Sequence, residues 1–487
     1  MSENLKWRKL DNSAKIFPLS AGRKYSTVFR LSAVMKEKVN SKILEKAVNK
    51  TLEKYSSFKV KMKYGFFWYY LEENTKSPII EEEKDYPCKY IDPSKNNDYL
   101  FKVTYFDTKI NIDIFHVLTD GGSGVVFFRE IIYTYLELLH PTVFNSNERL
   151  ARKIDYNTED SYLKNYEKNL KGNSSSKKAY ALKGKKIKLG AISAIHEIIN
   201  MSELKAECDR YGATVTQYLT AVLIYSIYEA NYKKYLEKKK VNNKNGERNT
   251  NNLAIDKKEK FFKKPIKVCI PVNLKKYFPS KTMSNFFSYI TLEADMKDLV
   301  TKAKSNQEGL KQEITKPKDS NEEQENDINQ KMLVDEQLFT TIIDFVKNDF
   351  KQKLTEEEII KTMSANVKLG TNLFIKAIPL ELKKVLVRLS YLEIRKYTTI
   401  TFSNIGRIGI IGKYKDYIDE FLMLIAPEPV EKIKCSGCTF ENKMSFTFTS
   451  ILNDNSIEKT FYHFLLNRGI SVKIESNGVL DDISKKD

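Results

Sequence analysis

The segment 109–139 constrains the fold most, because its hydrophobic period changes from two residues to about 3.6 within a few positions. In residues 109–116, isoleucine occupies the alternate positions 110, 112 and 114, which is typical of a strand with one buried face. The same parity places His116 on the buried face at the end of this strand. After Gly121 the apolar residues follow helical spacing. A strand that runs directly into a helix favours an α/β fold.

Strand-like and helix-like segments alternate along the rest of the chain, which also predicts a mixed α/β protein. A length of 487 residues allows two to four domains or one large two-lobed fold. The polar stretch 171–190 predicts a linker between an N-terminal unit, 1–170, and a C-terminal unit, 191–487. Two further polar stretches, 233–260 and 302–335, predict surface insertions, because neither can add much to a core.

The net charge is +19, from 82 Lys and Arg against 63 Asp and Glu. Such a charge could serve a nucleic acid, an anionic lipid or an anionic cofactor, but the basic residues are scattered among nearly as many acids. We therefore expect neither a nucleic-acid nor a membrane partner. No apolar stretch approaches the ~18 residues of a membrane span. The start of the chain lacks a secretory signal, and five cysteines suit a reducing compartment, so we expect a cytoplasmic protein.

The residues most indicative of chemistry are His116, Asp120, Gly121 and Gly122, which follow one another at the change from strand to helix. An inward imidazole can accept a proton near neutral pH, and the following helix N-terminus would disfavour its charged form. The aspartate can fix the turn, and the glycines permit backbone angles or close approaches that a side chain would block. A lone histidine on an apolar face is more often a structural core residue, so these residues alone leave both interpretations open.

The pattern His-x-x-x-Asp-Gly between a strand and a helix resembles the coenzyme A-dependent acyltransferases of the chloramphenicol acetyltransferase fold. This superfamily includes peptide-synthetase condensation domains and alcohol O-acetyltransferases. Residues 270–275 and 284–287 resemble the second-lobe segment where relatives carry a Val-Asp/Asn-x-Arg turn and then Gly-Asn. Residues 401–406 resemble the Ser-Asn-x-Gly strand beside the active channel, most of all in the alcohol acetyltransferase branch. The similarity extends over both lobes, from about residue 20 to 475.

The resemblance implies two lobes, each a mixed sheet with helices, that meet at a central channel. It also implies that His116, as general base, deprotonates an alcohol or amine that attacks acyl-CoA, with no covalent enzyme intermediate. Acyl-CoA would be a co-substrate, with no permanently bound cofactor, and we expect a monomer. Lys275 stands where relatives have an Arg that pairs with the motif aspartate, so we expect an Asp120–Lys275 pair. The residues implied to bind substrate or coenzyme A, or to stabilise the oxyanion, are Asn285, Ser403 and Asn404.

Two other functions stay open. A condensation-type enzyme would take its acyl group from a carrier protein, and a degenerate member of the fold would only bind ligands.

Two further segments receive structural interpretations. Cys435 and Cys438 have the spacing of half a zinc site, but no second Cys or His pair lies nearby, so we predict a tight turn and no metal. The segment 371–392 mixes apolar residues with lysines and could lie on a membrane interface. A buried amphipathic helix after Pro379 is the prediction that we prefer.

Overall fold

The computed structural model describes residues 7–144, 156–168, 170, 177–244, 263–311 and 323–480. In this part of the chain, the strands form three sheets. The first lobe contains the five-stranded sheet, whose order is β12 (Ile418–Ile425), β2 (Val28–Met35), β7 (Lys109–Phe115), β6 (Phe101–Phe106) and β5 (Ile80–Glu82). The small sheet has the order β1 (Trp7–Lys9), β4 (Tyr70–Glu73) and β3 (Val60–Lys63).

The second lobe is built on a seven-stranded sheet. Its order is β10 (Phe287–Ala294), β9 (Ile266–Asn273), β11 (Ile400–Arg407), β13 (Ile433–Phe440), β14 (Lys443–Ser450), β8 (Ser193–Asn200) and β15 (Val472–Ser476). β11 runs parallel to both of its neighbours, whereas the other pairs in this sheet are antiparallel. Each lobe has its own large cluster of buried apolar side chains.

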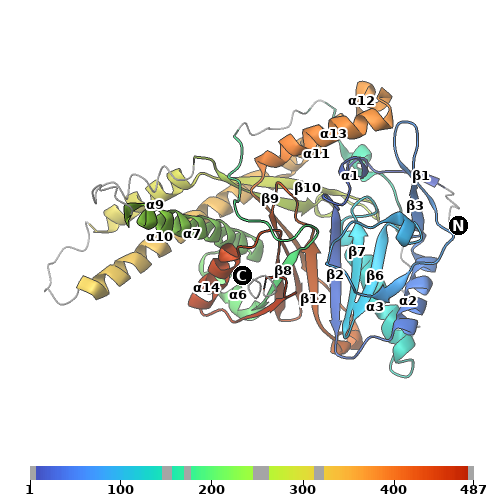
Figure 1. Ribbon diagram of the computed structural model, residues 1–487, viewed down its shortest axis with the longest axis horizontal. Coiled ribbons are helices and arrows are strands. Elements are labelled where there is room, and N and C mark those ends of the chain that lie inside the picture. Colours follow the sequence, from blue (N-terminus) through green and yellow to red (C-terminus); the bar gives the residue numbers. More distant parts are fainter. Residues whose placement is uncertain are drawn as a thin grey trace.

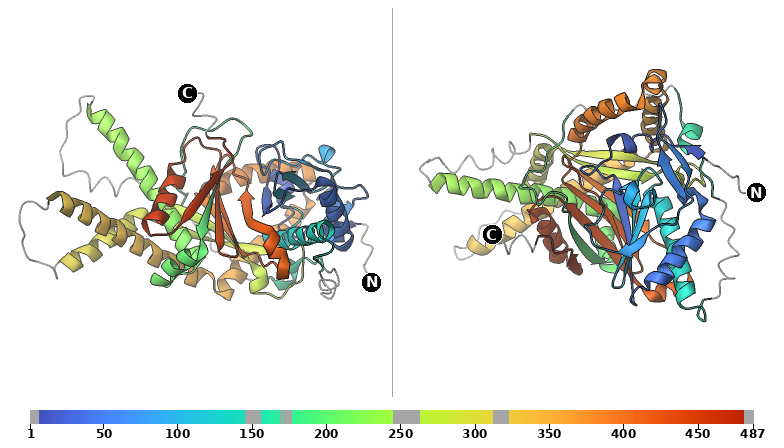
Figure 2. Two further views of the ribbon diagram at one scale, coloured as in Figure 1. Left: turned by 90° about the horizontal axis from the view of Figure 1, so that it is seen from below. Right: turned by 45° about the vertical axis from the view of Figure 1, so that its right-hand side comes forward.

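The helices before the second lobe are α1 (Phe17–Ser20), α2 (Ser41–Lys54), α3 (Gly121–Leu139) and α5 (Ser161–Asn165). The helices that follow β8, the first strand of the second lobe, are α6 (Met201–Arg210), α7 (Val215–Lys244), α9 (Met296–Lys311), α10 (Glu323–Lys353), α11 (Glu356–Thr371), α12 (Leu373–Ala377), α13 (Leu380–Ile394) and α14 (Ser456–Asn467). Figure 1 shows α11, α12 and α13 along the upper side of the molecule, reaching from one lobe to the other. Figure 2 shows the later part of α7, the end of α9 and the start of α10 projecting away from both lobes, whereas the rest of each helix packs in the second-lobe core.

The predicted strand and helix around His116 are both present. β7 ends at Phe115, and α3 begins at Gly121. The polar residues of β7 are buried as well as its isoleucines, because β2 supplies partners for them: Arg30 forms a bidentate pair with Asp113, and Ser32 donates to Asn111. The strand is therefore buried on both faces, although its alternation predicts one buried face.

The chain division differs from the sequence-based boundaries in one respect. β12 lies far beyond residue 190, yet it pairs antiparallel with β2 and completes the first-lobe sheet. The C-terminal unit therefore contributes a strand to the other lobe. The predicted insertion 233–260 begins as a continuation of α7 to Lys244, and its residues 245–260 lie outside the described part. The insertion 302–335 includes the end of α9 and the start of α10, and its residues 312–322 also lie outside the described part.

Candidate active site

His116 lies immediately after β7, and its backbone N–H donates to the carbonyl of Thr27 at 3.0 Å. Its imidazole stacks on the ring of Phe17 from α1, with the centroids 4.7 Å apart. The rings of Phe29 and Phe287 lie 5.2 Å away on other sides. Burial lowers the pKa of His116 below its usual 6.5, although hydrogen bonding to Asn285 opposes this effect. The imidazole is therefore neutral at pH 7, the form that can accept a proton.

The second lobe supplies the hydrogen-bond partner of this ring. Nδ1 of His116 lies 3.0 Å from Oδ1 of Asn285. The Nδ2 group of Asn285 donates to Oδ2 of Asp11 at 3.1 Å and to the His116 carbonyl at 3.0 Å. Because both of these partners are acceptors, the amide must present its oxygen to the ring. Nδ1 of His116 therefore carries the proton, and Nε2 retains the free lone pair.

Asp11 fixes the orientation of Asn285 from a position next to it. Its Oδ2 accepts the backbone N–H of Asn285 as well as the side-chain amide, each at 3.1 Å. Its Oδ1 accepts from the backbone of Ala14 at 2.8 Å and the hydroxyl of Ser13 at 3.1 Å. Burial raises the pKa of Asp11, but four donors converge on its two oxygens, which suits a carboxylate. The arrangement is a hydrogen-bonded chain from Asp11 through Asn285 to His116.

Asp120 braces the turn after His116 rather than contacting its ring. One carboxylate oxygen accepts the backbone N–H of Ser123 at 2.8 Å and so caps α3. The other accepts the backbone N–H of Phe286 from the second lobe at 2.9 Å. Thr119 adds a second bond between the lobes, to the carbonyl of Met283 at 2.7 Å. Asp120 thus joins the turn to the segment that carries Asn285, and its role is positional.

Lys275 also joins the lobes, but not through the pair expected from the sequence. Its Nζ, in the short 3-10 helix η4 (Leu274–Lys276), donates to the Ser123 hydroxyl at 2.7 Å and to the Thr282 carbonyl at 2.6 Å. No ion pair connects Lys275 with Asp120, although the structure describes both residues. The Asp120 carboxylate already accepts two backbone N–H groups, and Lys275 instead supports the first turn of α3.

The two glycines of the motif differ in the space that the structure leaves for a side chain. A Cβ added to Gly121 would lie 3.2 Å from Cγ2 of Ile405 on β11, a tight contact. A Cβ on Gly122 would lie 3.5 Å from the side chains of Asn273 and Asp120, an ordinary separation. Neither glycine has a positive φ. The close approach therefore applies at Gly121, and no special backbone angle is needed at either position.

The predicted Ser-Asn-x-Gly strand is β11, and its two candidates lie on opposite faces. Asn404 donates to the Thr216 hydroxyl at 3.0 Å and accepts the backbone N–H of Gly406 at 2.9 Å, so its amide faces α7. Ser403 shares the other face with Ile405, which meets Gly121 of the motif turn. The Ser403 side chain is half-buried and forms no hydrogen bond with the described residues. Of the two, Ser403 is the one on the face of β11 opposite α7.

Asp11 and Phe17 are site residues that the sequence did not indicate. They belong to an N-terminal segment without periodicity, and their partners lie more than 90 residues away in the chain. Arg8, from the same segment, donates to the Ser284 hydroxyl at 3.1 Å, one residue before Asn285. A single sequence carries no signal for such long-range pairs.

The two cysteines at 435 and 438 lie within β13, not in the predicted tight turn. Both are buried thiols, and burial raises the pKa of each above its usual value. Among the described residues, no group of three or more His, Cys, Asp or Glu side chains could hold a metal ion.

Solved structures resemble the chain over nearly its whole length. TRI101 of F. graminearum, complexed with coenzyme A and deoxynivalenol, superposes with a TM-score of 0.56 at 10% identity, covering 93% of this chain and 96% of that one. The trichothecene 15-O-acetyltransferase TRI3 from Fusarium sporotrichioides gives 0.52 at 8% identity, covering 96% of both chains. The starter condensation domain of rhizomide synthetase RzmA, in complex with C8-CoA and Leu-SNAC, gives 0.50 at 9% identity, covering 95% and 94%.

The chain shares the overall fold of these three structures. This likeness confirms the predicted two-lobed α/β fold class. No family model and no curated protein sequence matches the chain. At identities of 8 to 10%, the likeness establishes the fold alone. Among the helices of the described residues, none combines the length and apolar character needed to cross a membrane.

Proposed function

We propose that this protein is an acyltransferase that moves an acyl group, such as acetyl, from acyl-CoA to an alcohol or amine. The observation that carries the proposal is the hydrogen-bonded chain from Asp11 through Asn285 to His116. It holds a neutral imidazole in the tautomer whose Nε2 is free to accept a proton. It also joins the two lobes, because His116 follows a strand of the first lobe and Asn285 belongs to the second.

The reaction follows from this geometry. Nε2 of His116 takes the proton from the acceptor O–H or N–H, while the acceptor atom attacks the thioester carbonyl carbon. The resulting tetrahedral oxyanion collapses, the carbon–sulfur bond breaks, and the proton passes from His116 to the departing coenzyme A thiolate. No bond to the enzyme forms at any step. Asn285 and Asp11 act by keeping the proton on Nδ1, so they are positioning residues.

Ser403 is the donor that we assign to the oxyanion. Its hydroxyl makes no hydrogen bond with the described residues and lies on the face of β11 that meets the motif turn. Of the other sequence candidates, Asn285 donates both of its amide hydrogens to oxygen acceptors, and Asn404 directs its amide to Thr216 on α7. A preorganised donor of this kind lowers the barrier of acyl transfer by about 3–4 kcal/mol.

A condensation-type reaction, in which a carrier protein delivers the acyl group, is the second candidate. The fold likeness to the RzmA condensation domain, at a TM-score of 0.50, favours keeping it. The two reactions use different acyl donors, but His116 has the same role in both. A test therefore offers the same acyl group on coenzyme A and on an acyl carrier protein in parallel, with a panel of alcohols and amines.

The deciding experiment compares the wild type with His116→Ala by the release of free thiol from acetyl-CoA and by mass spectrometry of the acylated acceptor. We expect transfer to fall by at least about 100-fold, because general-base catalysis contributes about 10²- to 10⁴-fold. Thermal unfolding of both proteins checks that the variant is folded. Unchanged turnover by His116→Ala would contradict the proposal. Absence of thermal stabilisation by any thioester would favour a binding scaffold without activity.

A further inference from the structure

Helix α13 carries a continuous apolar stripe on its solvent side. Its exposed apolar residues recur at helical spacing of three and four: they are Leu382, Val385, Leu386 and Leu389. The opposite face packs on the protein through Leu380 and Lys383, which are both buried. The prediction of a buried amphipathic helix after Pro379 is therefore wrong, because the helix has two apolar faces and the protein covers only one of them.

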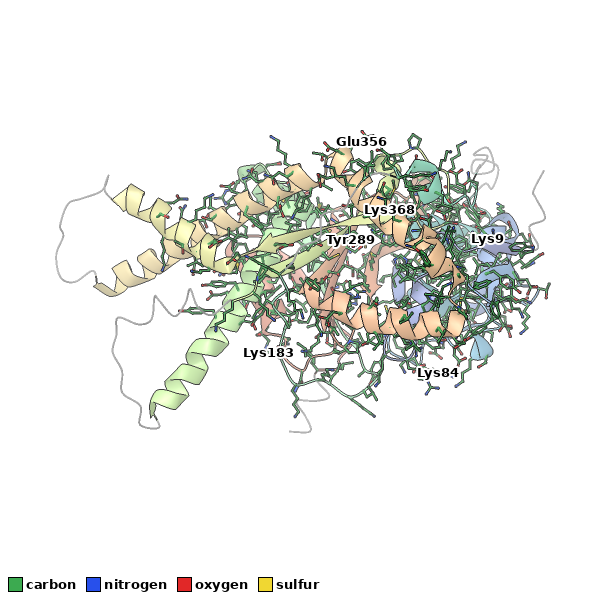
Figure 3. All side chains as sticks on the ribbon, turned by 90° about the horizontal axis from the view of Figure 1, so that it is seen from above. Lys9, Lys84, Lys183, Tyr289, Glu356 and Lys368 are labelled. Carbon is green, nitrogen blue, oxygen red and sulfur yellow. The ribbon has the colours of Figure 1, made fainter. Side chains whose placement is uncertain are left out.

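The exposed stripe continues onto two neighbouring elements. In α12, Leu373 is 78% exposed and Phe374 is 84% exposed. The turn between β3 and β4 adds Tyr64 and Phe66, the latter 73% exposed, and the Phe66 carbonyl accepts the backbone N–H of Leu380 at 3.0 Å. We call this set the α12–α13 surface; it comprises Tyr64, Phe66, Leu373, Phe374, Leu382, Val385, Leu386 and Leu389. Figure 3 looks onto α12 and α13 from above and shows them on one side of the molecule.

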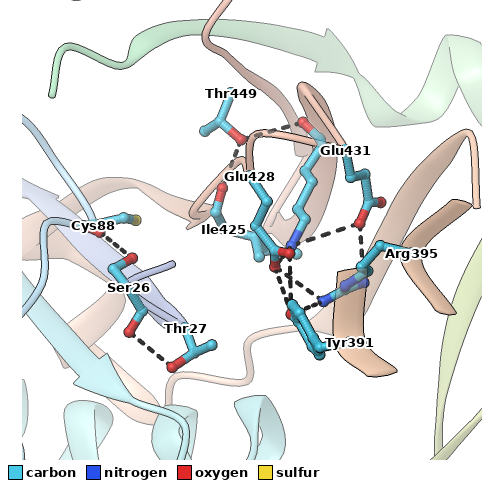
Figure 4. A network of polar contacts seen from close by, with 10 residues as sticks. Ser26, Thr27, Cys88, Tyr391, Arg395, Ile425, Glu428, Glu431 and Thr449 are labelled. Atoms are coloured by element: carbon cyan, nitrogen blue, oxygen red, sulfur yellow. Dashed lines mark hydrogen bonds and ion pairs between the residues drawn. The ribbon is translucent and has the colours of Figure 1, made fainter. Parts of the chain in front are cut away.

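The helix is fixed at both ends, so its exposed face belongs to a firmly attached element. At its N-terminal end, Lys383 donates to the Phe67 carbonyl at 2.9 Å and lies 3.7 Å from the centroid of the Trp68 ring. At its C-terminal end, Arg395 pairs with Glu428 at 2.9 Å and with Glu431 at 3.1 Å, both buried carboxylates (Figure 4). Lys434 and Tyr391 complete this buried network around Glu428.

Basic side chains border the α12–α13 surface. A cavity of about 300 Å³ between α13 and the loop after α1 is lined by Arg23, Lys24 and Arg388, among others. None of these three, nor Lys376 at the end of α12, forms an ion pair with a carboxylate of the described residues. The nearby acids are already paired: Glu381 with Lys384, and Glu393 with two lysines. The border therefore carries excess positive charge, beside exposed aromatic and aliphatic side chains.

We propose that the α12–α13 surface docks onto an anionic lipid membrane, with α13 lying in the plane of the interface. The apolar stripe would enter the boundary between headgroups and acyl chains, as amphipathic helices do at interfaces. Arg23, Lys24, Lys376 and Arg388 would meet lipid phosphates at its edge, where each basic residue adds attraction to an anionic leaflet. Tyr64 suits the headgroup region, and Phe374 suits the apolar face that enters the boundary. An exposed apolar area with this basic border fits lipid better than an acidic peptide, which would leave the stripe uncovered.

The test is flotation of the full chain with vesicles of phosphatidylcholine, with and without phosphatidylserine. We expect binding to the anionic vesicles, weakened by added salt because surface charges are screened. The double variant Phe374→Glu, Leu386→Glu should lower the bound fraction by about tenfold or more, since it places charges on two exposed apolar positions that would enter the membrane. The control is Leu189→Glu, which changes a residue that is 87% exposed and lies outside the surface. This control should bind like the wild type.

The outcomes separate this proposal from its competitors and from the acyltransferase proposal. Failure of the wild type to float with anionic vesicles, or equal binding by the double variant, would overturn it. A dimer that the double variant converts to a monomer, without vesicle binding, would assign the surface to a second copy and also overturn it. Circular dichroism and thermal unfolding confirm that each variant is folded. His116→Ala should bind vesicles like the wild type, so loss of catalysis and loss of docking are distinguishable.

Discussion

Replacing Asn285 by Leu tests the tautomer argument most directly. The substitution keeps a side chain of similar size in a fully buried position and removes the oxygen that holds Nδ1–H of His116. A hydrogen bond of this kind contributes about 1–1.5 kcal/mol, so its loss corresponds to about a tenfold decrease in rate. Nδ1 then has no fixed partner, and the wrong neutral tautomer competes. We therefore expect kcat to fall by about 10- to 100-fold.

The expected loss is smaller than that of His116→Ala, because the imidazole keeps its contacts with three aromatic rings. The pH profile gives a second, independent readout. The Asn285 hydrogen bond raises the pKa of His116 against the effect of burial. Its removal should lower this pKa further, so the acidic limb of kcat/KM should move to lower pH. A structural defect alone would leave that limb in place.

Asn111→Leu is the matched control. Asn111 is also a fully buried asparagine, and its side chain bonds to Ser32 and Glu83 on the first-lobe sheet without touching His116. Both variants should lose about 1–3 kcal/mol of unfolding free energy, measured by urea denaturation. Only Asn285→Leu should change the pH profile. An unchanged kcat, or an acidic limb that moves to higher pH, would refute the assignment of Asn285 as the group that fixes Nδ1–H.

Three further predictions concern Ser403, the motif glycines and His196. Ser403→Ala should lower kcat by about 10²- to 10³-fold with little change in KM, because an oxyanion donor acts in the transition state; steady-state kinetics that show no change would exclude Ser403. Gly121→Ala should lower the urea midpoint through its tight contact with Ile405, whereas Gly122→Ala should match or slightly exceed the wild type, since its new Cβ meets only ordinary separations. Burial lowers the pKa of His196 from 6.5 to about 3, with further lowering by two nearby cations. The unfolded chain therefore binds a proton that the folded chain does not, and unfolding free energy should fall by up to about 1.4 kcal/mol per pH unit as the pH drops from 6.5 towards 3. His196→Gln should lose that part of the pH dependence in urea titrations.

The motif segment was predictable because its determinants are local. The change of period places the boundary between β7 and α3. Asp120 caps the helix by accepting the backbone N–H of Ser123, which is only three residues further along the chain. The depth of burial was not predictable from the same alternation. Asn111 and Asp113 occur where a solvent face is expected, but partners on β2, which lie 79 and 83 residues earlier in the chain, allow the second face to be buried as well.

The site depends on contacts that no local pattern specifies. Asn285 was identified through a motif, but its role follows from the positions of His116 and Asp11, which are 169 and 274 residues away in the chain. The assignment of β12 to the first-lobe sheet has the same cause, because its partner β2 lies near the other end of the sequence. Residue type and spacing can identify candidate residues and strands, whereas their contacts across the lobes determine the role of each one.

Helix α13 shows why amphipathic patterning alone could not place the segment 371–392. A helix with apolar residues on two faces fits burial on either side, and its sequence does not say which face is covered. The structure covers the face with Leu380, which packs towards the first-lobe core, while α13 also packs against α1. Because α1 supplies Phe17 to the imidazole of His116, the inner face of α13 supports the proposed catalytic base indirectly. Substitutions on that inner face would disturb both proposed functions together. Those on the outer stripe leave the α1 contact intact, which is why they can test lipid docking separately from acyl transfer.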